Sequence, residues 1–295
     1  MATILLLSCG GDGNASGGAE TGPSAPAPSA VVVPVIGEIA PLPDGAVARV
    51  NGLRAGVTLP PGQPAPEPGM RLVRIDVELC AGEARLFVDS AFWLGLGEDD
   101  TVYSAHLGVR DLVTLTMAPG TCQRGTVDLA VAEGVGLRQV LLMDSTHTTV
   151  ARWSAEGRPG PLQPLGSEVT PELAVIGSPT ELTAGGSVTL HRVAPAAASS
   201  DRNAIGDGVL VRIDGEVCAG QREVHAGPRN WLVQLEDHRI VVPERTGSTM
   251  PTGPVDPNTC ERGTADFSVP AGAEARAVIY TDGGIFEEAR WRLPD

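Results

Sequence analysis

The chain has 295 residues and a formal net charge of −15, which disfavours binding to nucleic acids or to anionic membrane surfaces. Its 37 Gly and 25 Pro residues, with few long amphipathic runs, favour an all-β fold. All 21 basic residues are arginine, which excludes lysine chemistry such as a P-loop, a Schiff base or a Ser–Lys dyad.

The N-terminal residues 1–8 (MATILLLS) are apolar and precede Cys9, so that Leu6-Leu7-Ser8-Cys9 matches the lipobox of a bacterial lipoprotein signal peptide. No basic residue precedes the apolar run, and the run is short; a start codon assigned too far downstream would explain both. The alternative is an ordinary chain end with an incidental cysteine. Residues 9–30 are rich in Gly, Ser and Pro and are predicted to be a flexible tether. We therefore expect lipidation at Cys9 and a membrane-anchored, extracytoplasmic protein.

Two signatures recur at a constant offset of 138 positions. Residues 72–80 (LVRIDVELC) return as residues 210–218 (LVRIDGEVC), and residues 121–128 (TCQRGTVD) return as residues 259–266 (TCERGTAD). Trp93 and Trp153 return as Trp231 and Trp291. The pattern predicts two copies of one domain, residues 31–154 and 167–293, joined by a Pro-rich linker at residues 155–166.

Both signatures alternate apolar and polar residues, which is typical of strands with one buried face. If the two strands are antiparallel neighbours with Cys80 opposite Cys122, oppositely charged residues face each other across them, and such pairs select the register. The predicted pairs are Glu78–Arg124 and Arg74–Asp128 in the first copy, and Glu216–Arg262 and Arg212–Asp266 in the second.

Further short runs bounded by Gly, Pro or Asp predict strands at residues 46–50, 86–94, 102–104, 112–117, 138–143 and 149–154. Seven to nine short strands in each copy, with regular turn signals, predict two tandem immunoglobulin-like, Greek-key β-sandwich domains.

Four of the five cysteines form two pairs with the same spacing of 42 positions, one pair in each copy. The repeat predicts the disulfides Cys80–Cys122 and Cys218–Cys260, which implies an oxidising compartment. Along each strand, an even number of positions separates the cysteine from the charged residues, so the cysteine lies on the same face as they do. We therefore expect each bridge on the polar face of one sheet and not through the core. A zinc site would need a CxxC pair or well-spaced histidines, so we expect no metal and no cofactor.

The residues 72–79, Trp93-Leu94, Pro119-Gly120, 124–131 and Trp153, with their second-copy counterparts, form a recognisable pattern. It resembles the telokin-like, immunoglobulin-like domains of unknown function on secreted proteins and lipoproteins of Gram-positive bacteria. The resemblance implies an immunoglobulin-like sandwich and an extracellular setting, and it carries no catalytic residues. The cysteines in both signatures depart from the usual pattern of that family.

Several acidic groups recur between the copies, and each has a structural interpretation. We expect Asp76, Glu78 and Asp128 to pair with arginines and not to bind calcium, which prefers acidic loops. Residues 98–100 (EDD), together with Asp144 and Asp282, are predicted to form turns.

Residues 222–231 (REVHAGPRNW) differ most in character from their counterpart, residues 84–93. Because loops carry function on such scaffolds, Arg222, His225 and Arg229 are the candidate binding residues. Ser145 and His147 are close in sequence, but no GxSxG motif accompanies them.

We therefore expect a surface binding module without catalytic activity, whose partner is a protein or surface ligand in addition to the membrane. Two alternatives stay open. A secreted or surface enzyme would have a cleft with converging titratable groups in one copy only. A structural spacer or surface antigen would have neither a cleft nor a large exposed apolar patch.

Overall fold

The structure, a computed structural model, describes residues 33–59, 62–106, 111–156, 162, 165–166, 170–196, 208–244, 248–283 and 285–294. Cys9, the predicted signal peptide and tether, and most of the predicted linker lie outside this set. Residues 33–295 form one compact unit. None of the described helices is long and apolar enough to cross a membrane.

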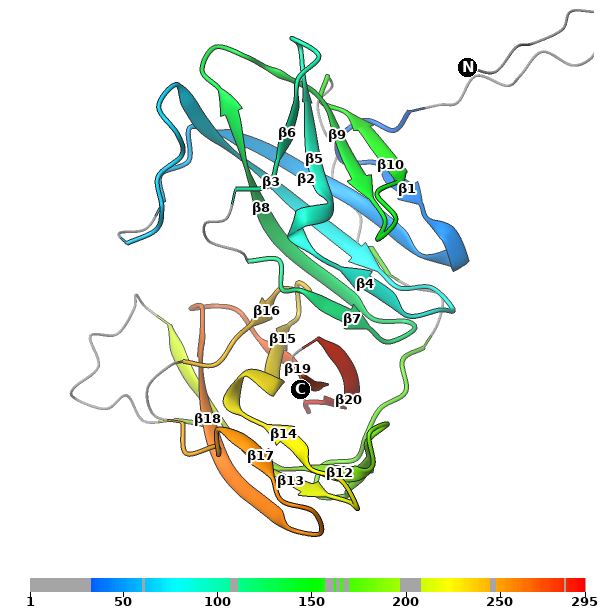
Figure 1. Ribbon diagram of the computed structural model, residues 1–295, viewed down its shortest axis with the longest axis vertical. Helices are drawn as coiled ribbons and strands as arrows, with labels where there is room; N and C mark the ends of the chain where they lie inside the picture. The colour runs from blue at the N-terminus through cyan, green and yellow to red at the C-terminus, as the bar shows by residue number, and fades with distance from the viewer. Residues whose placement is uncertain are drawn as a thin grey trace, which may run out of the picture. The chain divides into compact units, whose positions relative to one another are not determined.

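The first half of this unit is a sandwich of two antiparallel sheets (Figure 1). One sheet has the order β1-β2-β3-β8, and the other has the order β10-β9-β5-β6. β3 pairs with β8 and β5 pairs with β9, so each pairing joins strands that are not consecutive in the chain. These pairings give the Greek-key arrangement of immunoglobulin-like folds. The strands are β1 (Ile39–Pro41), β2 (Val47–Ala55), β3 (Met70–Cys80), β4 (Leu86–Val88), β5 (Trp93–Gly97), β6 (Val102–Ser104), β7 (Leu115–Met117), β8 (Cys122–Ala132), β9 (Leu137–Met143) and β10 (Thr149–Ser154).

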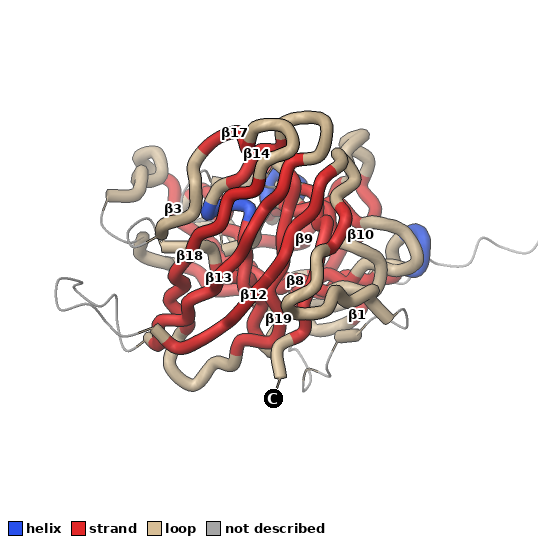
Figure 2. Tube along the Cα trace, turned by 90° about the horizontal axis from the view of Figure 1, so that it is seen from below, coloured by secondary structure: helices blue, strands red, loops and turns tan. Residues whose placement is uncertain are grey.

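The second half repeats this plan, and β12, β13 and β18 lie side by side in Figure 2. Its second sheet has six strands in the order β16-β15-β19-β20-β7-β4, so that it continues into the first half through a parallel pairing of Phe286 with Thr116. The strands are β11 (Thr180–Glu181), β12 (Gly186–Pro195), β13 (Val209–Ala219), β14 (Val224–Ala226), β15 (Trp231–Leu235), β16 (Ile240–Val241), β17 (Gly253–Val255), β18 (Cys260–Val269), β19 (Ala275–Asp282) and β20 (Phe286–Arg292). The predicted all-β fold of two immunoglobulin-like sandwiches is confirmed.

Two of the predicted strands are shorter than expected. The run at residues 86–94 divides into β4, a 3-10 turn at Ser90–Phe92 (η2) and the start of β5. Asp89 causes the division, because its Oδ1 accepts a hydrogen bond from the Ala91 N–H at 2.8 Å and starts the turn. Only Leu115–Met117 of the run at residues 112–117 is a strand, paired with β4.

Both predicted disulfides are present, and the predicted strand register is confirmed. Cys80 is bonded to Cys122 and Cys218 to Cys260, each pair directly opposite on neighbouring strands of one sheet. Each bridge therefore joins two strands within a sheet and does not cross the core, as predicted from the position of the cysteines on the polar face.

One of the two charge pairs predicted for each copy differs from the prediction. Arg74 and Arg212 bind the opposite aspartates, Asp128 and Asp266, as expected, at 2.7 and 2.6 Å. Arg124, however, reaches the diagonal neighbour Asp76 through two hydrogen bonds and not Glu78, which it faces. The second copy repeats this diagonal, and the hydrogen bonds from Arg262 hold the pKa of Asp214 below its ordinary value.

Glu78 is bound elsewhere, which explains the diagonal. Its Oε2 accepts a hydrogen bond from Arg49 at 2.7 Å, and its Oε1 lies 2.7 Å from Nδ1 of His238, a residue of the second half. The backbone N–H of Arg124 also donates to the backbone carbonyl of His238 at 2.9 Å. The second half thus covers the end of this polar face that carries Glu78.

A buried polar network of Glu287, Arg290 and Gln234 also joins the halves. Arg290 donates to both carboxylate oxygens of Glu287, at 2.7 and 3.1 Å, and to Oε1 of Gln234. The amide nitrogen of Gln234 donates to the backbone carbonyl of Cys122 in the first half. All three side chains are buried, whereas Arg152, the counterpart of Arg290, is exposed. A buried charge of this kind requires its partners to stay in place.

The four tryptophans are core anchors in both sandwiches. Trp93 stacks on Trp153 with ring centroids 5.7 Å apart, and Trp231 stacks on Trp291 at 5.8 Å; all four are fully buried. Gly215 stands in the second copy where the first has Val77, because a Cβ at Gly215 would lie 2.5 Å from the ring of Trp231.

The glycines of the repeated Arg-Gly pair, Gly125 and Gly263, allow a neighbouring segment to cross close to β8 and β18. A Cβ at Gly263 would lie 2.6 Å from the backbone of Met250, and a Cβ at Gly125 would lie 2.6 Å from that of Leu112. Both crossing segments donate backbone hydrogen bonds to the strands that they cover. The glycine of each Arg-Gly pair is therefore explained by the close approach of a neighbouring backbone segment.

We predict that Gly263→Ala destabilises the protein by about 1–3 kcal/mol, because the backbone of residues 249–250 must move away from the new methyl group. Gly52→Ala is the control, since no atom lies within 4 Å of the Cβ position there. Urea unfolding followed by tryptophan fluorescence measures both. Equal stability of the two variants would show that the close approach is unimportant.

We predict that Arg290→Ala costs about 3–5 kcal/mol of unfolding free energy, because it leaves the Glu287 carboxylate buried without its partner. Arg152→Ala, at the exposed counterpart, should change the free energy by no more than about 0.5 kcal/mol. The same unfolding measurement compares them, and similar losses at the two positions would contradict a special role for the buried pair.

Candidate functional site

A cavity of about 910 Å³ lies where the two halves meet. Strand β14, the 3-10 turn Pro228–Asn230 (η3), the segment after β16 and the β19–β20 turn line it from the second half. Val113 and Thr114 line it from the first half. Its size is in the range of cavities that hold small organic ligands.

Much of the cavity lining is apolar. Val224 and Leu232 are buried core residues that form part of the lining. Val242 and Ile285, which also line it, are large apolar side chains with 55% and 38% of their surface exposed. Exposed aliphatic residues gathered around one cavity favour the binding of an apolar group.

Polar side chains reach the same cavity from β14 and η3. The alternation of β14 buries Val224 and Ala226 and exposes His225. Asn230 holds η3 against β19, because its Nδ2 donates to the Thr281 carbonyl at 2.7 Å and its own carbonyl accepts from the Thr281 hydroxyl. Pro228 at the start of η3 restricts the turn further. Arg229 is thus presented to solvent from a rigid support.

Two exposed, charged side chains at this cavity are free to bind a ligand, and the half-buried Asp282 lines it as well. Arg229 and Glu223 are exposed, and neither has a hydrogen bond or ion pair with any other described residue. The same is true of the imidazole of His225. Most other arginines near the junction, such as Arg49, Arg124 and Arg290, are bound to carboxylates. Unpaired groups of both signs beside an apolar lining suit an amphipathic ligand.

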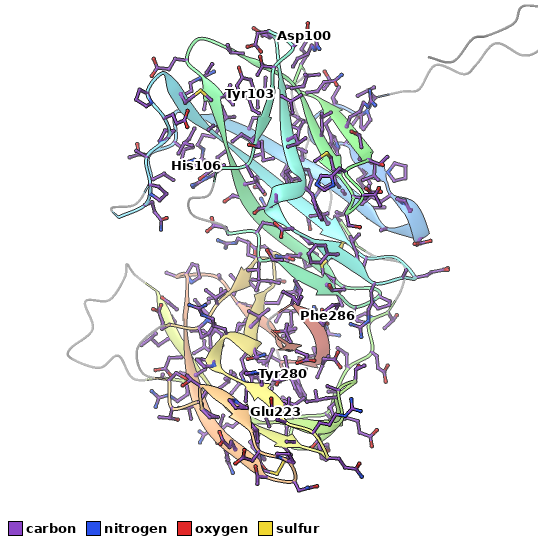
Figure 3. All side chains as sticks on the ribbon, viewed as in Figure 1. Asp100, Tyr103, His106, Glu223, Tyr280 and Phe286 are labelled. Carbon is purple, nitrogen blue, oxygen red and sulfur yellow. A yellow bond between two sulfur atoms is a disulfide. The ribbon has the colours of Figure 1, made fainter. Side chains whose placement is uncertain are left out.

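Tyr280 supports β14 from beneath. Burial raises the pKa of its phenol, with a further contribution from the charge of Asp282. Its hydroxyl donates to the backbone carbonyl of His225 at 3.4 Å. Tyr280 and Glu223 are labelled in the second half in Figure 3.

The three predicted binding residues have different positions. His225 and Arg229 line the cavity, whereas Arg222 is exposed and does not. Sequence reasoning missed Asn230 and the first-half residues Val113 and Thr114. Asn230 could have been found from the sequence, because the first copy has Phe92 at the equivalent position. Nothing in the sequence indicates that residues 113–114 lie beside η3.

The acidic turns fold as predicted. Asp99 accepts hydrogen bonds from Thr101 and Tyr103, and Asp144 accepts them from Thr146 and Thr148. Donation from Thr146 lowers the pKa of the Asp144 carboxyl. Ser145 and His147 lie in the same tight turn. The carboxylates of Asp99 and Asp144 thus form turns, and their hydrogen-bonding capacity is used locally.

A smaller cavity of about 380 Å³ lies within the first half, beside Phe87, Phe92 and Trp93. Several polar groups on its rim are already bound. Arg85 donates to the Glu287 carbonyl at 2.8 Å, and Asp89 and Asp144 accept local hydrogen bonds. This cavity therefore offers fewer free polar groups to a ligand than the larger one.

The carboxylate of Glu216 and the sulfurs of Cys218 and Cys260 lie within 4.8 Å of one another. Both sulfurs are in the disulfide, so they are not thiolates and do not form a metal site in this state.

The fold and the cavity define a tandem immunoglobulin-like β-sandwich chain with a ligand-sized cavity between its halves. No family model and no curated protein matches the chain. Among solved structures, the chain is similar to MPT63, a secreted protein from Mycobacterium tuberculosis, with 14% sequence identity and a TM-score of 0.35 over 42% of this chain and 96% of that one. The telokin-like resemblance stays a prediction.

Proposed function

We propose that this protein is an extracytoplasmic, lipid-anchored surface protein that binds a ligand and has no catalytic activity. The ligand site is the 910 Å³ cavity between β14, η3 and residues 113–114. The observation that carries the proposal is the combination of an apolar lining with the unpaired Arg229 and Glu223.

The lining suits a small amphipathic molecule or the end of a peptide. An apolar body would contact Val113, Val242 and Ile285, and an anionic group would pair with Arg229, which is always charged. Arginine also offers a planar pair of donors that matches a carboxylate, sulfonate or phosphate.

The proposed location is supported by the two disulfides, which persist in oxidising compartments. The proposed anchor is supported by the lipobox-like residues before Cys9 and the Gly- and Pro-rich segment after it. The net charge of −15 favours attachment through a lipid over direct electrostatic binding to an anionic membrane.

We predict that 1-anilinonaphthalene-8-sulfonate, which combines an apolar body with one anionic group, binds the folded protein at a single saturable site. Arg229→Ala should weaken binding by about tenfold, since a charge-assisted hydrogen bond contributes roughly 1.5–3 kcal/mol and an exposed one contributes least. Fluorescence titration and calorimetry measure affinity and stoichiometry.

Arg222→Ala is the matched control, because Arg222 is exposed in the same segment but does not line the cavity. A second variant, Val242→Asp, places a negative charge in the apolar wall. It should also weaken binding, because this charge repels the sulfonate and the apolar contact is lost. Absence of saturable binding, or equal losses for Arg222→Ala and Arg229→Ala, would refute the cavity as the site.

We predict that the protein expressed in a lipoprotein-processing bacterium begins at Cys9 and carries a diacylglyceryl group there. Intact-mass measurement of the membrane fraction tests this, with Cys9→Ser as the control that should remove the lipid mass. A mature protein that retains residues 1–8 and a free thiol at Cys9 would contradict the anchor.

A further inference from the structure

The two disulfides occupy equivalent positions but have different surroundings. Cys80 and Cys122 are buried, and Leu165 and Val47 pack against them. Cys260 is exposed and Cys218 is half-buried. An external thiol can therefore reach the second disulfide in the folded protein but not the first.

The polar groups beside the two bridges also differ. Oε1 of Glu216 lies 3.5 Å from the sulfur of Cys218, and its Oε2 lies 2.9 Å from Nε2 of His191. The Glu216 and His191 side chains each keep more than a quarter of their surface exposed. A carboxylate and an imidazole thus lie next to the half-buried sulfur of Cys218.

The first copy lacks this arrangement. Its corresponding carboxylate, Glu78, is buried and bound by Arg49 and His238. The bulge position of β2 that corresponds to His191 holds Asn51, which cannot carry a proton. The two copies have therefore diverged at the groups nearest to the disulfide.

We propose that Cys218–Cys260 is a thiol–disulfide exchange site for an external thiol, either a small molecule or a cysteine of another protein. The thiolate attacks the exposed sulfur of Cys260, and the half-buried Cys218 leaves.

The step is balanced in atoms and electrons. A bond forms between the incoming sulfur and the sulfur of Cys260, while the Cys218–Cys260 bond breaks and its electron pair stays on Cys218. The resulting Cys218 thiolate takes up the proton held by the Glu216–His191 pair. The incoming thiol is oxidised to the sulfur of a mixed disulfide, and Cys218 is reduced.

Access and charge both select this direction. Cys260 is the exposed sulfur, so an external thiolate reaches it from solvent, whereas Cys218 is half-buried and has a carboxylate oxygen of Glu216 at 3.5 Å. A thiolate that develops at Cys218 is repelled by an ionised Glu216, so a proton on the pair lowers the barrier to departure.

The test uses the full chain without its lipid, with Cys9 alkylated beforehand, and reduced glutathione as the thiol. After acid quenching, peptide mass mapping should find glutathione on Cys260, a free thiol at Cys218 and an intact Cys80–Cys122 bond. The second disulfide should react faster than the first by on the order of tenfold or more. His191→Asn, which places the first copy's residue at this bulge, removes the group that can hold the proton and leaves Glu216 in place, so it should slow the reaction by about tenfold, below the usual range for general acid catalysis.

Leu165→Ala is a second variant that tests access independently. It should accelerate exchange at Cys80–Cys122, which Leu165 covers, and leave the rate at Cys218–Cys260 unchanged. Thermal melts check that both variants fold. Equal rates at the two disulfides of the unmodified protein, no reaction while the chain is folded, glutathione on Cys218, or an unchanged rate in a folded His191→Asn variant would each overturn the proposal.

Discussion

The buried ion pair between Arg290 and Glu287, extended by Gln234 to the Cys122 carbonyl, holds the two sandwiches against each other. Because a desolvated charge is costly without its partners, the network tolerates little movement at the junction. Two other features depend on it: residues 113–114 lie beside η3, which forms the cavity, and His238 reaches Glu78. The contact with His238 in turn leaves Arg124 to pair with Asp76.

The junction explains why two copies of one fold differ in detail. In the first copy, the second half covers the Glu78 end of the polar face that carries the disulfide, Leu165 packs against the disulfide, and Glu78 and Arg49 are buried. In the second copy the same face is open, and Glu216 contacts His191 and the sulfur of Cys218. Duplication thus produced one face for packing and an equivalent face that is free for chemistry or binding.

The cavity and the exposed disulfide are separate features of the second half. The cavity depends on β14, η3 and the β19–β20 turn, which differ from their first-half counterparts in side-chain character. The disulfide depends on β13 and β18, whose backbone is nearly the same in both halves. The rigid sandwich supports both, because its tryptophan pairs and close glycine contacts define the positions of the strands.

Local rules were enough for a large part of this fold. Strand alternation, equal cysteine spacing and opposite charges across β3 and β8 determined the sandwich class, both disulfides and the register, because each depends on neighbours along or across one strand pair. Only the tertiary structure decided that Arg290 is buried while Arg152 is exposed, that Glu78 binds His238, and that Val113 completes a cavity with Arg229. These contacts join surfaces far apart in sequence, and their energies depend on desolvation, which no local pattern encodes.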